Sequence, residues 1–227
     1  MTLAGRGAII TWNDIAPEGR DEFYAWHIEE HIPERLAVPG FLRASRYLAA
    51  LPETAPEFLT LYETAGADVA TSAPYLDRLN APTAWTKRAT SHFRNTSRAL
   101  TSVAVTAGVG RGGVMATLRF DSNGAAALER LRIDCTPITA SARRPRIVGA
   151  HLCLTDAASS AAKTAESRDR KDILAAPAGA VLIEGCSVAD VAPVVAALVS
   201  ECGLGSAGVH AGIYRLEYTR LKTEERS

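Results

Sequence analysis

Apolar and polar residues recur with two different periods along the chain, and these periods predict its strands and helices. Short runs of β-branched and aromatic residues, including 7–12, 57–63 and 99–106, are bounded by turn-forming residues and predict strands. Along residues 20–37 an apolar residue recurs instead at every fourth position, at Tyr24, Ile28, Ile32 and Leu36. This spacing predicts a helix with one apolar stripe, which Pro33 should kink or tighten because proline removes a backbone donor.

The predicted elements follow the order β-α-β-β-α-β twice. Further strands are expected at 41–51 in the first half and at 113–121, 146–156, 179–185 and 207–221 in the second. A glycine-rich stretch, 108–113, separates the halves and lacks the lysine of a phosphate-binding loop. We therefore expect two repeats, 1–108 with a helical insert near 81–94, and 109–227 with a mobile loop insert near 157–178.

Charge and cysteine content narrow the class of protein. The chain has 227 residues, with 25 Lys and Arg against 25 Asp and Glu, so it lacks the excess of cations that nucleic-acid binding requires. It shows no signal-peptide pattern and no apolar run long enough to span a bilayer, so we expect a cytoplasmic protein that does not bind membranes. The four cysteines lack zinc-site spacing and are predicted to be buried free thiols.

One segment makes the pattern more specific. Residues 26–47, WHIEEHIPERLAVPGFLRASRY, combine a helix bearing two histidines, a Pro-Gly-Phe turn and a strand bearing Arg and Tyr. This segment resembles the dimeric α+β barrel superfamily, in the branch related to the ethyl tert-butyl ether degradation protein D (EthD). The resemblance is strong over 7–106 and much weaker over 113–221, where the histidines are missing.

The resemblance implies an α+β fold in which two tandem ferredoxin-like repeats pack their antiparallel sheets as an α+β barrel around an apolar cavity. It also implies a homodimer, although one chain already supplies both sheets and could close the barrel alone. Similar proteins include cofactor-free monooxygenases, haem-degrading enzymes, isomerases and polyketide cyclases. A shared fold does not transfer an activity, so the reaction stays open.

His27 and His31 are the leading candidates for chemistry. They form the string H-x-x-E-H with Glu30, which alone matches an inverted zinc-protease motif, but no third ligand follows on another helix. Three interpretations stay open. The imidazoles could act as acid or base, or hold a carbonyl, in a pocket; they could bind a divalent metal; or they could serve the helix structurally through neighbouring glutamates.

The other candidates lie on the strands and among the aromatic residues. Strand alternation puts Arg43 and Tyr47 on one face, where they could position a substrate oxygen, with Tyr47 also a candidate catalytic residue. Arg46 lies on the opposite face, where we expect an ion pair with Glu63 or a helix carboxylate. The expected apolar walls of the pocket are the aromatic residues Trp12, Tyr24, Trp26 and Trp85.

These residues predict a small-molecule-binding protein, most simply a cofactor-free enzyme acting on a small apolar, oxygen-bearing compound. The alternatives are a non-catalytic binding protein and a haem or metal protein, with His92 or His151 as haem ligands; His151 and His210 could also face the cavity or lie in the core. The site is expected in the first half, between helix 20–37 and strand 41–51, and outside the glycine-rich linker and the 157–178 loop.

Overall fold

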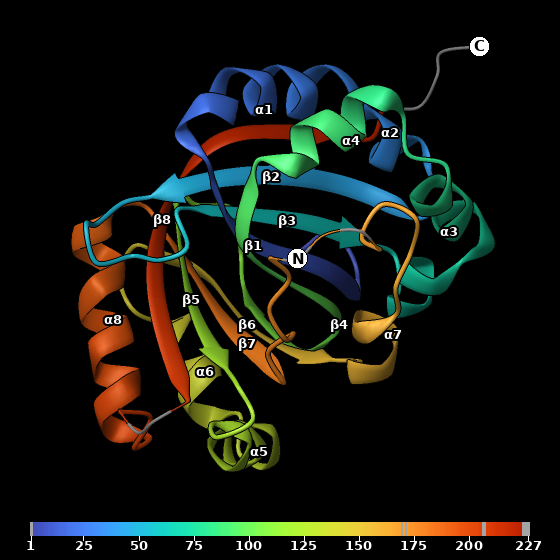
Figure 1. Ribbon diagram of the computed structural model, residues 1–227. Helices are drawn as coiled ribbons and strands as arrows, with labels where there is room; N and C mark the ends of the chain where they lie inside the picture. Colours follow the sequence, from blue (N-terminus) through green and yellow to red (C-terminus); the bar gives the residue numbers. More distant parts are fainter. Residues whose placement is uncertain (1, 169, 171, 206–207, 224–227) are drawn as a thin grey trace.

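The computed structural model describes residues 2–168, 170, 172–205 and 208–223. Its central feature is a closed barrel in the strand order β1-β3-β2-β8-β5-β7-β6-β4, and every neighbouring pair is antiparallel (Figure 1). This arrangement confirms the expected α+β class and the barrel. Ladder hydrogen bonds join the two halves between β2 and β8 and between β4 and β6, so the barrel closes within one chain.

The elements of both halves lie close to their predicted places. In the first half they are β1 (Gly7–Ile15), α1 (Arg20–Trp26), α2 (Ile32–Ala37), β2 (Phe41–Ala49), β3 (Phe58–Thr64), α3 (Ala73–Asn80), α4 (Ala84–Ser91) and β4 (Phe93–Gly108). In the second half they are β5 (Val114–Phe120), α5 (Ala125–Ile133), α6 (Thr136–Ser141), β6 (Ile147–Thr155), α7 (Ala157–Ala161), β7 (Gly179–Gly185), α8 (Val188–Glu201) and β8 (Val209–Leu221). Short 3-10 turns lie at Pro17–Gly19 and Ala67–Thr71.

The barrel interior is filled by side chains, which corrects the expectation of a cavity between two facing sheets. Its packing follows strand alternation, because every second residue of each strand points inward. The buried cluster includes Ile10, Trp12, Tyr47, Leu59, Leu61, Met115, Leu182 and Tyr214. A cavity on one outer face of the barrel is instead the candidate site.

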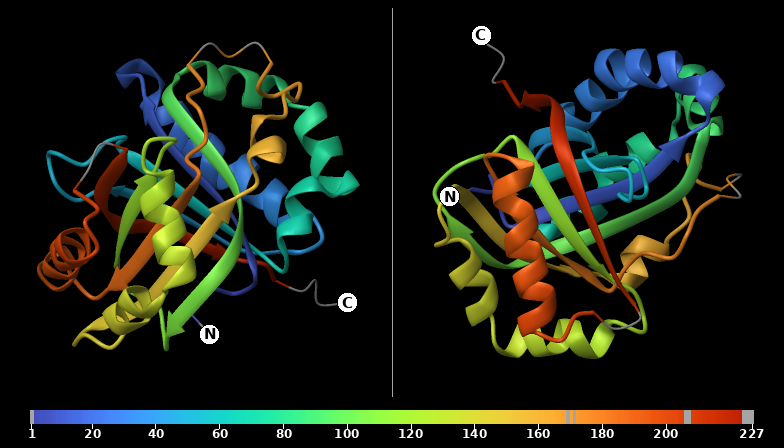
Figure 2. Two further views of the ribbon diagram at one scale, coloured as in Figure 1. Left: turned by 90° about the horizontal axis from the view of Figure 1, so that it is seen from below. Right: turned by 90° about the vertical axis from the view of Figure 1, so that its left-hand side faces the viewer.

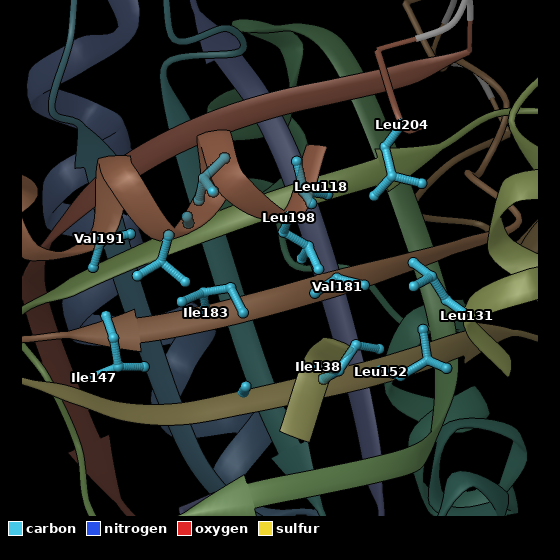
Figure 3. Packing of buried hydrophobic residues seen from close by; sticks show 14 of the residues in the cluster. Leu118, Leu131, Ile138, Ile147, Leu152, Val181, Ile183, Val191, Leu198 and Leu204 are labelled. Atoms are coloured by element: carbon cyan, nitrogen blue, oxygen red, sulfur yellow. The ribbon is translucent and has the colours of Figure 1, made fainter. Parts of the chain in front are cut away.

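The outer face of the second half is also filled. The helices α5, α6 and α8 cover it, and their apolar residues meet those of β5, β6 and β7 in one aliphatic cluster (Figure 3). Leu118 of β5 and Leu198 of α8, for example, are almost completely buried. Aliphatic packing of this kind stabilises the fold and leaves no polar group suited to chemistry.

The outer face of the first half is covered differently. The helices α1 to α4 lie on this side of the barrel, and a segment from the second half, 157–176, runs beside α3 and α4 (Figure 2). The backbone nitrogen of Glu166 donates to the Leu79 oxygen at 3.0 Å, and that of Leu174 donates to the Thr96 oxygen at 2.7 Å. The predicted loop insert therefore covers the first half, beginning with the short helix α7.

The helix expected over 20–37 has an irregular centre. The helices α1 and α2 are continuous through a π-helical turn, His27–His31, which ends two residues before Pro33. Proline cannot donate a helical hydrogen bond, and insertion of a wider turn is one of the known ways to accommodate such a defect. The sequence predicted a kink or a tightening of the helix at Pro33, whereas the structure has a wider helical turn just before it. This wide turn begins and ends at the two candidate histidines, His27 and His31.

Two further observations concern whole-chain features. Cys135, Cys153, Cys186 and Cys202 are all free, as predicted, but the prediction that they are buried holds for Cys153 alone: Cys186 is exposed, and Cys135 and Cys202 are half-buried. Within the described residues, no helix combines the length and the apolar character needed to cross a membrane.

Candidate functional site

A cavity of about 380 Å³ lies on the outer face of the first half. Its floor is the outer face of β1, β3 and β4, its sides are the helices α1 to α3, and its cover is the segment 157–176. The residues that line it include Phe23, Trp26, His27, His31, Arg35, Tyr62, Phe93, Arg98 and Glu166. This volume lies near the lower end of the range for small-molecule pockets.

The π-helical turn brings the two histidines together. The rings of His27 and His31 stack with their centroids 5.5 Å apart and an interplanar angle of 20°. Trp26 lies beside His31, with ring centroids 4.2 Å apart, and its indole nitrogen donates to the Thr86 hydroxyl at 3.1 Å. Wide helical turns of this type are frequent at functional sites, and here the turn aligns three aromatic rings along one wall.

His27 is held in one tautomer by its neighbours. The Arg46 guanidinium lies 3.2 Å from His27 Nδ1, and because arginine can only donate, Nδ1 must accept. The proton is then on Nε2, which lies 3.4 Å from the Tyr62 hydroxyl. Burial, followed by the charges of Arg46 and Arg35, lowers the pKa of His27 well below its usual 6.5. His27 is therefore a neutral imidazole with both nitrogens engaged.

His31 is neutral for the same reasons but is not engaged. Burial lowers its pKa well below 6.5, and the charges of Arg35, His27 and Arg98 lower it further. Its Nδ1 is buried without a hydrogen-bond partner among the described residues. Buried polar atoms without a partner are rare in folded proteins, and each one indicates a missing water, ligand or proton acceptor. His31 is thus the imidazole that a ligand can use.

A buried ion pair between the two halves lies next to the histidines. Arg35 on α2 is only 3 % exposed, and its Nη2 lies 2.5 Å from Oε2 of Glu166 in the covering segment. The other terminal nitrogen, Nη1, is buried and has no acceptor in the part of the chain that the structure describes. One half of the guanidinium fork is therefore used by the protein, and the other half is available.

Among the residues that the structure describes, the remaining polar groups of the cavity carry no negative charge. Arg98 on β4 is partly buried in its wall. Tyr62 on β3 is buried, and burial raises the pKa of its hydroxyl above the usual 10.0, so it stays a neutral donor. The apolar surface comes from Trp26, Phe23 and Phe93, whose rings contact one another edge to face or through His27. An aromatic wall facing cationic groups suits a flat ligand that carries oxygen.

The structure separates the sequence-predicted site residues into two groups. Trp26, His27 and His31 line the cavity. Tyr24 and Trp85 instead pack in a neighbouring cluster, where Tyr24 lies under the Arg46 guanidinium at 4.7 Å. The reason is helical geometry, because Tyr24 faces the strand β2 beside the cavity, and Trp85 lies at the outer edge of α4.

Trp12, Arg43 and Tyr47 lie inside the barrel, on the opposite side of the sheet from the histidines. Trp12 and Tyr47 belong to the buried interior cluster. Arg43 forms the ion pair with Glu63 that was expected of Arg46, with both nitrogen–oxygen distances at 2.6 Å. Arg46 pairs instead with Glu217 of β8 at 2.7 Å. The backbone of a sheet separates the side chains on its two faces, so side chains on opposite faces cannot line the same pocket.

The position of the cavity also corrects two expectations about the chain. The helix 20–37 forms one side as predicted, but no residue of the strand 41–51 lines the cavity; β1, β3 and β4 do. The segment 157–178 was expected to lie outside the site, yet it supplies the cover and Glu166. The glycine-rich linker places Arg111 at one end of the barrel, where it donates to Glu63 and Tyr47.

Sequence reasoning missed Arg35, Arg98 and Glu166. Arg35 follows His31 by four residues, so the i, i+4 rule could have placed it on the same helix face. Arg98 lies two residues after Thr96 and shares its outward face by strand alternation. Nothing in the sequence links Glu166 to the first half, because the contact crosses between two distant segments.

Neither histidine considered for haem ligation suits that role. Both ring nitrogens of His151 are engaged inside the barrel, by the hydroxyls of Thr2 at 3.2 Å and Thr106 at 2.9 Å. His92 lies beside Glu22 at 3.6 Å and does not line the cavity. Within the described part of the chain, no group of three or more His, Cys, Asp or Glu residues is arranged to hold a metal ion.

Comparison with known proteins supports the fold. No protein-family model and no curated protein matches the chain. An anthrone oxidase-like protein of known structure matches with a TM-score of 0.59 and 12% identity, covering 99% of this chain and 97% of its own. A monooxygenase-like protein from Lactobacillus acidophilus NCFM matches with a TM-score of 0.55 and 11% identity, over 96% and 97% of the two chains.

A chlorite dismutase variant from Candidatus Nitrospira defluvii matches with a TM-score of 0.54 and 10% identity, covering 96% of this chain and 93% of its own. All three likenesses extend over nearly the whole chain, and together they show an α+β barrel fold. At these identities they do not carry over an activity, a substrate or a cofactor.

Proposed function

We propose that this protein is an enzyme that binds a small, largely apolar, oxygen-bearing compound in the cavity of its first half, without a cofactor. One observation carries the proposal: an unengaged neutral imidazole, that of His31, shares an aromatic-walled cavity with the guanidinium groups of Arg35 and Arg98. The monooxygenase-like and anthrone oxidase-like neighbours support a compound of this class. An EthD-like relationship is part of the same proposal.

The groups of the cavity suit proton removal next to a carbonyl. A neutral imidazole can accept a proton from carbon, while the electron pair moves onto the carbonyl oxygen. Cationic donors stabilise the oxyanion that forms, and their effect is strongest where water is excluded. In this scheme Arg35 and Arg98 stabilise the oxygen as His31 accepts the proton, and the negative charge that forms offsets the cationic surroundings that otherwise make His31 a weak base. His27 is a positioning residue, because its own nitrogens are engaged by Arg46 and Tyr62.

The proposal is tested with anthrone, a flat ketone with an acidic carbon–hydrogen bond. Binding is followed by quenching of tryptophan fluorescence, and proton removal by exchange of that hydrogen for deuterium. Loss of a positioned acid or base lowers a rate by about 10²–10⁴-fold, so His31→Gln should slow exchange by that factor. His210→Gln is the matched control, because His210 is exposed and pairs with Asp121 away from the cavity.

Equal exchange rates for His31→Gln, His210→Gln and the unaltered protein would contradict the catalytic role. Binding without exchange would favour the second candidate, a non-catalytic binding protein, which the same cavity supports. The haem or metal alternative is tested by an absorption spectrum and metal analysis of the purified protein. A Soret band or stoichiometric metal would overturn the cofactor-free proposal.

We also propose that the two halves, 1–108 and 109–227, are tandem ferredoxin-like repeats from an internal duplication. Each half has its four strands in the spatial order fourth, first, third, second: β4-β1-β3-β2 and β8-β5-β7-β6. Glu63 and Glu184 support the duplication, because each lies near the end of the third strand of its half. Superposition of the halves tests it.

Homodimer formation is a further part of the proposal. The described strands form a closed barrel without a free edge, so a second copy would dock on helices and loops. Light scattering of the purified protein tests it, and a monomeric mass at all concentrations would contradict it. A cytoplasmic location stays a proposal that fractionation of the source cells can test.

A further inference from the structure

The described residues that line the cavity have a surplus of positive charge. Among the described residues that line it, Arg35, Arg98 and Arg170 are cationic and Glu166 is the anionic residue. Arg170 is neutralised by Asp172, whose carboxylate lies 3.0 Å from its Nη2. With Arg35 paired to Glu166, one guanidinium charge, that of Arg98, is left over in the wall. A charge in a partly desolvated wall is stabilised by an opposite charge nearby.

The donors of the inner wall are also incompletely used. Arg35 engages Glu166 through Nη2, while its Nη1 is buried without an acceptor. Within the described residues, Arg98 has no ion-pair or hydrogen-bond partner. Guanidinium groups bind carboxylates through two parallel donors, and such charge-assisted hydrogen bonds are about twice as strong as neutral ones.

We infer that the oxygen-bearing group of the ligand is a carboxylate, whose oxygens bind to Arg98 and Arg35 while the aromatic body of the ligand lies against Trp26 and Phe93. This inference rests on the proposed function and names the substrate class for the same site. Glu166 already shows that a carboxylate fits against Arg35, and it acts as an internal competitor for that guanidinium. Burial is the main cause of the low pKa of His31, and the charges of Arg35, His27 and Arg98 lower that pKa further.

Two probes of nearly equal size and different charge test the inference. Naphthoate carries a carboxylate, and naphthalenemethanol carries a neutral hydroxyl on the same ring system. We expect naphthoate to bind at least about tenfold more tightly near neutral pH, measured by calorimetry, since a hydrogen bond to a charged group contributes that much or more. Arg98→Gln should remove most of this preference and leave naphthalenemethanol binding within about twofold.

Glu166→Gln provides a second test. Its expected result would not follow if the ion pair between Arg35 and Glu166 had only a structural role. Removal of the competing carboxylate should tighten naphthoate binding and leave naphthalenemethanol binding unchanged. Arg132→Gln is the matched control, because Arg132 is exposed on α5 and pairs with Glu129 there. It should alter neither affinity.

The outcomes separate this inference from the proposed function. Equal binding of the two probes, or an equal loss of both in Arg98→Gln, would overturn the carboxylate inference and leave the proposed apolar pocket standing. If neither probe binds, the proposed pocket fails for small aromatic compounds and the carboxylate inference fails with it.

Discussion

Glu63 and Glu184 occupy matching positions on β3 and β7, but only Glu63 faces an arginine on the neighbouring strand. Arg43 on β2 lies opposite Glu63 on β3, whereas Gly149 on β6 lies opposite Glu184 on β7. Glu63 accepts two hydrogen bonds from Arg43 and a third from the backbone nitrogen of Ala4. Both oxygens of Glu184 are buried without a hydrogen-bond partner, although Arg111 Nε lies 3.2 Å away. Equivalent carboxylates therefore have unequal surroundings.

Glu184→Gln should change how stability depends on pH. Burial raises the pKa of Glu184 from 4.5 to about 7, and the nearby charge of Glu63 also raises it. The native state therefore binds this proton more tightly than the unfolded chain, and stability falls as pH rises between these two values. The free energy of unfolding of the unaltered protein should drop, relative to that of Glu184→Gln, by roughly 3 kcal/mol across this window. Urea denaturation at several pH values measures the difference, and parallel curves would contradict the prediction.

Glu63→Gln should be much more destabilising than Glu184→Gln. The glutamine would leave Arg43 and Arg111 without their shared carboxylate, and removal of one partner of a buried ion pair costs about 3–5 kcal/mol. The comparison at neutral pH is controlled by design, because the two substitutions are chemically identical and lie at matching positions. Similar losses of unfolding free energy in the two variants would contradict the prediction. They would show that the arginine partners of Glu63 contribute no more to stability than the surroundings of Glu184 do.

His27→Gln should make the fold less sensitive to acid. The pKa of His27 is held well below 6.5 by burial and by Arg46 and Arg35. The unfolded chain then binds this proton more readily, so the stability due to neutral His27 is present above pH 6.5 and is lost as pH falls below that value. We expect a smaller loss of unfolding free energy between neutral and mildly acidic pH in His27→Gln than in the unaltered protein. His210→Gln, with an exposed ring, should behave like the unaltered protein.

Leu198→Ala should lower the stability of the protein without changing ligand binding. Leu198 on α8 is 3 % exposed and belongs to the aliphatic cluster of the second half. Truncation of a buried leucine costs about 2–5 kcal/mol, so the midpoint of urea denaturation should fall clearly. Because that cluster lies apart from the cavity, naphthoate should bind the folded variant with unchanged affinity. A matching loss of affinity well below the denaturation midpoint would assign the second half a role in the site.

The sequence alone was enough to predict the order of the elements and the class of the fold. Alternating and fourfold periods reflect which residues of each element face the core, so these signals are local and can be read along the chain. The stripe that ends at Leu36 predicts the helix, and the alternation through Arg43 and Tyr47 predicts their shared face. The helical histidines and the tryptophans of the first half also pointed to the side of the barrel on which the cavity lies.

Tertiary structure decided which candidates meet. A sheet separates the interior, where Tyr47 lies, from the outer face, where His31 lies, and no local pattern tells which face holds the cavity. The ion pair between Arg35 and Glu166 joins residues 131 positions apart. Such contacts depend on where the 157–176 segment packs on the first half. The polar composition of this segment does not predict that position. Long-range packing therefore determined the site, and local periodicity determined the scaffold.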